Sequence, residues 1–354
     1  MTLAYDEASD ARPLMYIDQN IIDGLRKERF SFEPHVFNRD FRAVYSDETL
    51  REIKRAEDGG GDSSEYLRVL SDINAFHLRQ NLSEKFELLN NATLQTASPW
   101  QIYSAFTENL WLDDFVEAQT LINQKIMGGL PEQSWEDIAR KMVEVYVLLD
   151  ESVIKSLDTV KEASPELGQL IFEHRDSLGG DSLLGVEIYR ESVQKLVEGL
   201  KNNLNDDRSE QSVIDAYRSE LRLRPKELNN LKPPNVVEQV WQVISADKAI
   251  QSSGIDMHRY FGINSVNPAY PHRNFYASEQ VANIYLQLNL AGYFADEKLH
   301  QERGFRASNS DMNHVAMATY CNYLISNDMR LLKKAAAAYD CLDINTEIID
   351  ISAK

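Results

Sequence analysis

A short apolar run near the C-terminus, Tyr323 to Ile325, places the strongest constraint on the fold, because polar residues follow it at once and Asp328 lies just beyond. An apolar run of this length with a polar end is typical of a buried parallel strand. A helix is predicted ahead of it, with Ser310 as its cap and Asp311 in its first turn. In open α/β sheets, functional groups gather beyond the carboxyl ends of the strands, which is where we expect Asp328.

The N-terminal part of the chain contains two similar pieces. Leu14 to Ile17 is another short apolar run, followed directly by Asp18 and by a predicted helix over residues 19–29. Val44 to Ser46 predicts a further strand end, with Glu52 one turn into the helix that follows it. Strands that end in acids therefore occur at both ends of the chain, and a last strand is predicted over residues 343–351.

These motifs, in this order, resemble those of the PIN-like nuclease family. The resemblance covers roughly residues 12–58 and 290–352 and implies Asp18, Glu52, Asp311 and Asp328 as the four acids of the family's site, with Ser326 where the family often has threonine or serine. It implies an α/β fold, a PIN-like three-layer core with a short central parallel sheet, interrupted by a large all-α insertion.

The domain organisation expected from this resemblance has three segments. Residues 1–58 would form the first part of the core, residues 59–275 a helical insertion and residues 276–354 the second part of the core. The helical patterning includes Trp135, Ile138, Met142, Val145 and Leu149, which share one helix face. The separation of 311 − 52 = 259 positions between the second and third acids makes this an enlarged member of the family.

The four acids are of the type that holds a hard divalent cation, Mg²⁺ or Mn²⁺, which can neutralise a phosphodiester and activate water. Asp18 and Asp311 are predicted as direct ligands, and Glu52 and Asp328 as ligands directly or through water. Asn20, His314 and Ser326 are predicted to orient these ligands from behind.

Each acid also has a simpler interpretation. Asp18 can be a helix cap and Asp311 a first-turn acid. Glu52 can be a solvated helix residue among neighbouring arginines and a lysine, and His314 a hydrogen-bonded core histidine. Only the joint arrangement of the acids favours catalysis.

Composition narrows the functional classes. The formal net charge of −19 argues against a broad basic surface for long nucleic acids. Two cysteines, Cys321 and Cys341, predict no disulfide framework, and no apolar run approaches the roughly 20 residues of a membrane span. A cytoplasmic protein without a membrane partner is expected.

Residues 257–278 contain no acid and combine arginines with aromatic residues. This composition is typical of segments that bind single-stranded nucleic acid, so Arg259 and Arg273 are predicted contacts. The alternative is an aromatic segment that packs between lobes. Arg303, Arg306 and Lys333 are further candidates for phosphate contacts, with a solvated helix face as the alternative for Lys333.

The function expected from the sequence is a metal-dependent endoribonuclease that cleaves single-stranded or loop RNA, with DNA as an alternative substrate. Two other hypotheses stay open. One is a non-catalytic scaffold on a decayed nuclease core, and the other is a toxin or defence effector, which could cleave DNA and be restrained by a regulatory protein or by homo-oligomerisation.

Overall fold

The computed structural model describes residues 2–3, 12–30, 39–83, 88–107, 111–164, 185–203, 213–267 and 270–351. The chain divides into two compact units. The first, here called the sheet unit, comprises Met1–Thr107, Asp215–Lys298 and Arg306–Lys354. The second, the helical unit, comprises Glu108–Ile214 and Leu299–Phe305.

The sheet unit is built on a seven-stranded sheet in the order β1-β5-β4-β3-β2-β8-β9. All neighbouring strands are parallel except β4 and β5, which are antiparallel. The strands are β1 (Thr2–Leu3), β2 (Leu14–Ile17), β3 (Arg42–Ser46), β4 (Phe76–Leu82), β5 (Leu88–Gln95), β8 (Tyr323–Ser326) and β9 (Glu347–Asp350). The fold is therefore α/β with a mostly parallel sheet, and the strands predicted at both ends of the chain are confirmed.

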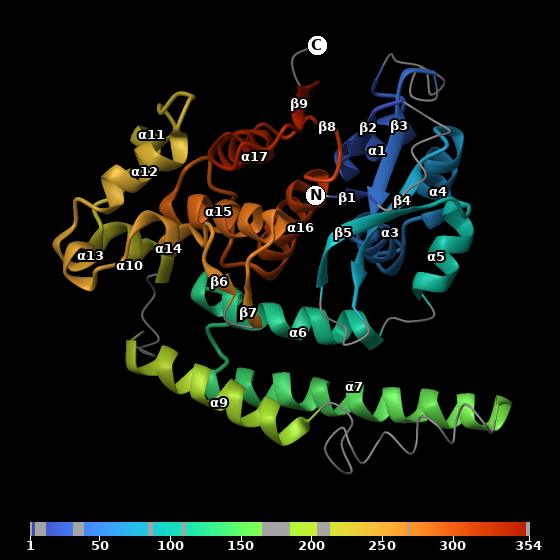
Figure 1. Ribbon diagram of the computed structural model, residues 1–354, viewed down its shortest axis with the longest axis horizontal. Helices are drawn as coiled ribbons and strands as arrows, with labels where there is room; N and C mark the ends of the chain where they lie inside the picture. The colour runs from blue at the N-terminus through green and yellow to red at the C-terminus, as the bar shows by residue number, and fades with distance from the viewer. Residues whose placement is uncertain are drawn as a thin grey trace. The chain divides into compact units, whose positions relative to one another are not determined.

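The chain reverses its direction of travel across the sheet between β2 and β8. From β2 it moves outward through β3 and β4, and it later returns to place β8 on the other side of β2 before continuing to β9. Ile17 pairs with Ile325, so the two strands end together although they come from opposite ends of the chain (Figure 1). Such a switch point leaves a crevice beyond the carboxyl ends of the strands, the usual position of a ligand site in open α/β sheets.

Helices cover both faces of the sheet because its central strands are apolar on both sides. Leu14 and Tyr16 belong to one core cluster, whereas Met15 and Ile17 belong to the other. The first cluster contains residues of α12 (Val236–Ile244), α14 (Met257–Phe261), α15 (Ala277–Ala291), α16 (Glu302–Ala318) and α17 (Met329–Cys341). The second contains residues of α1 (Gln19–Arg26), α3 (Asp47–Asp58), α4 (Ser63–Asp72) and α5 (Pro99–Thr107).

Smaller elements complete the sheet unit. A separate two-stranded sheet joins β6 (Val266–Asn267) to β7 (Tyr270–Asn274) in antiparallel fashion. Short helices α10 (Val213–Glu220), α11 (Pro225–Leu228) and α13 (Lys248–Ser253) precede it in the chain.

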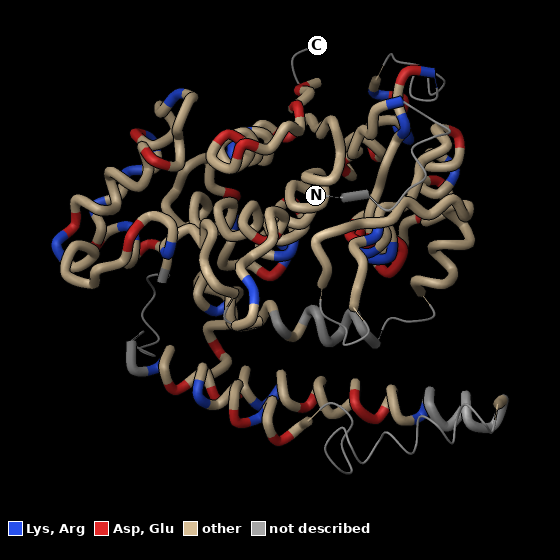
Figure 2. Tube along the Cα trace, viewed as in Figure 1, with Lys and Arg blue, Asp and Glu red and all other residues tan. Residues whose placement is uncertain are grey.

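The helical unit contains α6 (Trp111–Ile126), α7 (Trp135–Ala163) and α9 (Val186–Asn203). Trp135, Ile138 and Met142 are buried in its core, and Val145 packs against that core, as the apolar spacing predicted. Both acidic and basic residues occur along the described parts of α7 and α9 (Figure 2). None of the described helices combines the length and apolar character that crossing a membrane requires.

The boundaries of the expected insertion differ from the observed units. Residues 59–275 were expected to be all-helical, but they contain β4 and β5, which belong to the main sheet, and β6 and β7. Residues 215–275 also belong to the sheet unit. The strands were missed because β4 reads Phe-His-Leu-Arg-Gln-Asn-Leu and β5 carries two asparagines, so neither shows the continuous apolar run of a central strand.

Candidate functional site

Asp18 and Asp328 lie at the same edge of the sheet and are joined by one side chain. Asp18 follows β2, is only 1% exposed, and its Oδ2 accepts hydrogen bonds from Ser326 Oγ (2.7 Å) and Asn20 Nδ2 (3.1 Å). Ser326 Oγ in turn accepts a hydrogen bond from the backbone amide of Asp328 (3.0 Å). The structure thus places the first and fourth predicted acids together, and it places Asn20 and Ser326 against the first.

Asp328 also begins the helix that follows it. Its Oδ1 accepts hydrogen bonds from the amides of Arg330 (2.7 Å) and Leu331 (3.1 Å), which makes Asp328 the N-cap of α17. A cap of this kind fixes the position of the carboxylate and satisfies helix donors that otherwise lack a partner.

Glu52 is held by a buried chain of hydrogen bonds. His314, which has no exposed surface, lies with Nε2 2.9 Å from Glu52 Oε2 and with Nδ1 2.8 Å from the Tyr16 hydroxyl. The Tyr16 hydroxyl also hydrogen bonds to Ser46 Oγ (2.6 Å). Burial opposes protonation of His314, but the neighbouring oxygens of Tyr16, Glu52 and Asp18 outweigh it and raise the pKa of the imidazole well above its ordinary value.

The sequence predicted Ser310 as a helix cap, but the structure shows that it does not cap a helix. Helix α16 begins eight residues earlier, at Glu302, so both Ser310 and Asp311 lie within the helix rather than in its first turn. Ser310 Oγ instead lies 2.6 Å from Glu48 Oε1 and 2.8 Å from Glu52 Oε1. The serine therefore links Glu48 and Glu52 of α3 to α16.

Glu48 is an acid of this region that sequence reasoning missed. Its side chain is buried and accepts hydrogen bonds from Ser310 Oγ and Asn313 Nδ2 (3.0 Å), with Arg51 (3.3 Å) and Arg55 (3.1 Å) as ion-pair partners. Burial would raise its pKa, but the arginines, the imidazole of α16 and the serine hydroxyl lower it overall. The available signal was its position four residues before Glu52, which puts both glutamates on one helix face.

Asp311 differs from the other acids because no described residue donates a hydrogen bond to its carboxylate or forms an ion pair with it. Burial, together with the negative charges of Asp18, Asp296 and Asp328, raises the pKa of Asp311 well above its ordinary value, although His314 acts in the opposite direction. Burial likewise raises the pKa of Asp18, and Glu52 adds to this while His314, Ser326 and Asn20 oppose it. Negative charge is therefore concentrated here, and Asp311 has no direct cationic partner among the described residues.

Asp296 is a further acid of the sheet unit with little exposed surface. Its side chain is 11% exposed, and Lys334, with no exposed surface, lies with Nζ 2.5 Å from Asp296 Oδ1. Asp296 Oδ2 accepts hydrogen bonds from Ser308 Oγ (2.7 Å), Asn289 Nδ2 (2.9 Å) and the Tyr285 hydroxyl (3.4 Å). Lys334 was missed because a lysine six residues into a helix is usually solvated.

The chemistry of the donors suits a hard divalent cation, since Asp18, Asp311 and Asp328 provide carboxylate oxygens and Asp311 has no partner of its own. Across the described ranges, no three His, Cys, Asp or Glu side chains are spaced as a ready-made coordinating group. Buried carboxylates whose charges repel one another have raised pKa values when no cation lies between them, as Asp18 and Asp311 do. These side chains therefore fit a cation by charge and donor type, and binding would have to draw them together.

Arg273 is already engaged within the protein. Its side chain is 11% exposed, forms ion pairs with both carboxylate oxygens of Glu279 (2.6 and 2.9 Å), and stacks over the rings of Tyr270 and Tyr276. This arrangement matches the packing alternative for the acid-free segment rather than a free phosphate contact. Arg259, on α14, is exposed.

The remaining predicted phosphate contacts are exposed. Arg306 and Lys333 belong to the sheet unit, on α16 and α17, whereas Arg303 belongs to the helical unit. Exposure is compatible with a phosphate contact but does not test it, so their role stays a prediction.

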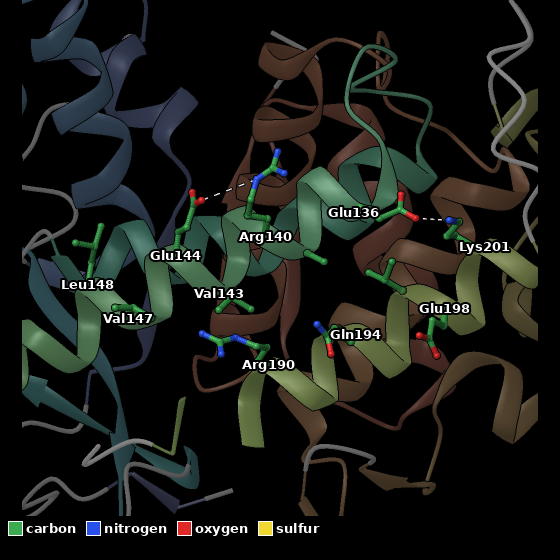
Figure 3. A pocket seen from close by; sticks show the side chains of 12 residues that line it. Glu136, Arg140, Val143, Glu144, Val147, Leu148, Arg190, Gln194, Glu198 and Lys201 are labelled. Carbon is green, nitrogen blue, oxygen red and sulfur yellow. Dashed lines mark hydrogen bonds and ion pairs between the residues drawn. The ribbon is translucent and has the colours of Figure 1, made fainter. Parts of the chain in front are cut away.

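A groove of about 920 Å³ lies between α7 and α9 in the helical unit (Figure 3). Val143, Val147 and Leu148 provide apolar lining. Its Glu136 forms an ion pair with Lys201, and Glu144 lies 3.9 Å from Arg140. Because these carboxylates already have cationic partners, the groove is a weaker candidate for metal chemistry than the sheet edge.

Compared with family models, curated proteins and solved structures, the chain matches none of them.

Proposed function

We propose that the sheet unit is a PIN-like nuclease core and that the protein is a divalent-metal-dependent phosphodiesterase acting on RNA. The observation that carries this proposal is the buried Asp311 carboxylate, whose pKa is raised by that burial and by the charges of Asp18, Asp296 and Asp328 and which has no hydrogen-bond donor or ion pair from any described residue. An uncompensated charge of this kind costs folding free energy and is typical of functional sites. Asp18 and Asp328, which follow the two strands at the sheet's switch point, support the same conclusion.

In this proposal, Asp18, Asp311 and Asp328 hold Mg²⁺ or Mn²⁺. When bound, the cation supplies Lewis-acid polarisation of the phosphate and of water. Ser326 and Asn20 orient the Asp18 carboxylate through the hydrogen bonds that both donate to Oδ2. Ser326 also keeps Asp18 and Asp328 in register, because it bonds to both residues.

Glu52 has a different task from the other acids. With its carboxylate oriented by His314 and Ser310, it is suited to bind water or to accept a proton at the edge of the site. The imidazole of His314, whose pKa is raised, holds the Glu52 carboxylate in one orientation. Tyr16 fixes the ring from the other side.

The substrate proposed is single-stranded or loop RNA, with DNA as the alternative. A formal net charge of −19 disfavours long duplexes that bind along a broad basic surface. Flexible single strands need fewer phosphate contacts, which the exposed Arg259, Arg306 and Lys333 are candidates to provide.

The test is incubation of the purified full-length protein with mixed RNA and DNA pools, with Mn²⁺ or with EDTA. We expect Mn²⁺-dependent cleavage of RNA, and Asp18→Asn should reduce it by more than the roughly 10–100-fold lost when an outer hydrogen-bond partner of a ligand is removed. Asp343→Asn, at an exposed acid of the same unit, is the control and should cleave normally. Cleavage that survives Asp18→Asn unchanged would refute the proposal.

A non-catalytic scaffold is the second candidate, and a specific observation favours it. Glu52 and Asp296 are both engaged with protein partners, His314 and Lys334, as in a structural network of polar groups. A scaffold predicts no cleavage and no stabilisation by Mn²⁺. A rise in melting temperature with Mn²⁺ that Asp18→Asn abolishes would exclude it.

A further inference from the structure

Lys334 provides positive charge inside the acidic edge of the sheet unit. The lysine lies on α17, the same helix that Asp328 caps, and its side chain has no exposed surface. Its Nζ contacts Asp296 Oδ1 at 2.5 Å, lies 3.4 Å from Asn289 Oδ1 and 4.3 Å from the centre of the Tyr285 ring. Burial lowers the pKa of the Lys334 ammonium group, and the carboxylates of Asp296, Asp311 and Asp328 oppose that effect.

Both carboxylate oxygens of Asp296 already have partners among the described residues. One carboxylate oxygen faces Lys334, and the other accepts hydrogen bonds from Ser308, Asn289 and Tyr285. Its backbone amide donates to Asn289 Oδ1 (2.8 Å), which fixes the loop that carries it. The Asp296 carboxylate therefore has a cationic partner, whereas Asp311, whose pKa burial and the charge of Asp296 raise, has none of these partners.

We propose that Lys334 takes the place of a second metal ion, so that the site binds one divalent cation rather than two. Two-metal phosphodiesterase sites use paired cations to neutralise a shared group of carboxylates. Here the ammonium neutralises Asp296, which leaves Asp18, Asp311 and Asp328 for a single cation. This inference rests on the proposed metal site and specifies how many cations that site holds.

The role of Lys334 is positional, since it acts through Asp296 and Asp311. Removing the ammonium group should release Asp296 as a ligand and create room for a second cation. Lys334→Met keeps most of the length of the side chain without its charge. Adding Asp296→Asn to that variant removes the carboxylate that would receive the second cation.

The experiment measures the number of Mn²⁺ ions bound per full-length chain, by equilibrium dialysis and by the loss of the free-ion electron paramagnetic resonance signal. We expect one Mn²⁺ for the wild type, two for Lys334→Met and one for Lys334→Met/Asp296→Asn. Circular dichroism in EDTA and in Mn²⁺ shows whether each variant is folded. Lys334→Met should depend on Mn²⁺ for folding more than the wild type does, and the double variant should lose that extra dependence.

The possible outcomes separate this inference from the proposed function. Two Mn²⁺ ions in the wild type, or a single ion in Lys334→Met, would overturn the role of Lys334 and leave the metal site intact. Failure of Lys334→Met to fold even in Mn²⁺ would also count against it, because a second cation should replace the ammonium. No Mn²⁺ in the wild type would overturn both proposals.

Discussion

Asp311→Asn offers the sharpest test of the site, because the substitution should have opposite effects with and without metal. Burial and the charges of Asp18, Asp296 and Asp328 raise the pKa of Asp311. When folding raises the pKa of an acid, the protein loses stability as the pH climbs from the pKa of the unfolded state towards that of the folded state. The loss persists at higher pH. At neutral pH and without metal, the ionised carboxylate therefore opposes folding.

The size of the effect follows from the charges that the substitution removes. Like charges within several ångströms at an effective dielectric constant of about 20 repel by roughly 1–3 kcal/mol. Part of this gain is offset, because the asparagine amide is buried in the same place. In EDTA, Asp311→Asn should thus be about 1–2 kcal/mol more stable than the wild type, or about 2–6 °C higher in melting temperature.

Mn²⁺ should reverse the order of stability, so that the wild type becomes more stable than Asp311→Asn. A ligand at 100 times its dissociation constant adds about 2.7 kcal/mol to the stability of a folded protein. The wild type should gain this increment in Mn²⁺, whereas Asp311→Asn should gain little of it. Differential scanning calorimetry in EDTA and in Mn²⁺ measures both values, with Asp343→Asn as a matched control at an exposed position.

Two results would refute this reasoning. If Asp311→Asn is less stable than the wild type in EDTA, the carboxylate has a stabilising partner and is not under repulsion. If the variant keeps the full Mn²⁺ increment, Asp311 is not a ligand.

Three further predictions concern the surrounding side chains. Ser326→Ala removes the hydroxyl that bonds to Asp18, and should lower the free energy of unfolding by about 1–3 kcal/mol in urea titrations. A change below about 0.5 kcal/mol, the size expected of an ordinary surface substitution, would show that the hydroxyl does not hold the acid. Because folding lowers the pKa of Glu48, this residue adds to the free energy of unfolding at neutral pH, and the addition is lost as the pH falls through and below the ordinary glutamate range. Glu48→Gln should therefore flatten the acid side of a plot of unfolding free energy against pH. A plot parallel to that of the wild type would contradict this. Arg273→Ala should destabilise the protein by leaving Glu279 without its ion-pair partner, while RNA affinity measured by fluorescence anisotropy stays within about twofold; a larger loss of affinity with unchanged stability would restore the phosphate-contact hypothesis.

Strand positions and the neighbourhood of two acids could be predicted from local patterns. Leu14 to Ile17 and Tyr323 to Ile325 are short apolar runs that suit central parallel strands, and both were found as such. Since parallel strands end at one edge of the sheet, Asp18 and Asp328 had to lie near each other once β2 and β8 became neighbours.

Partners of the charged side chains depended on tertiary structure. The hydrogen bond between Ser310 and Glu48 joins residues 262 positions apart, and Lys334 meets Asp296 across 38 positions. Local sequence shows which residues carry charge, but it does not show which charges burial will bring into contact. For this reason, composition suggested Arg273 as a nucleic-acid contact, and only the tertiary structure showed that Arg273 is paired with Glu279 and Asp296 with Lys334.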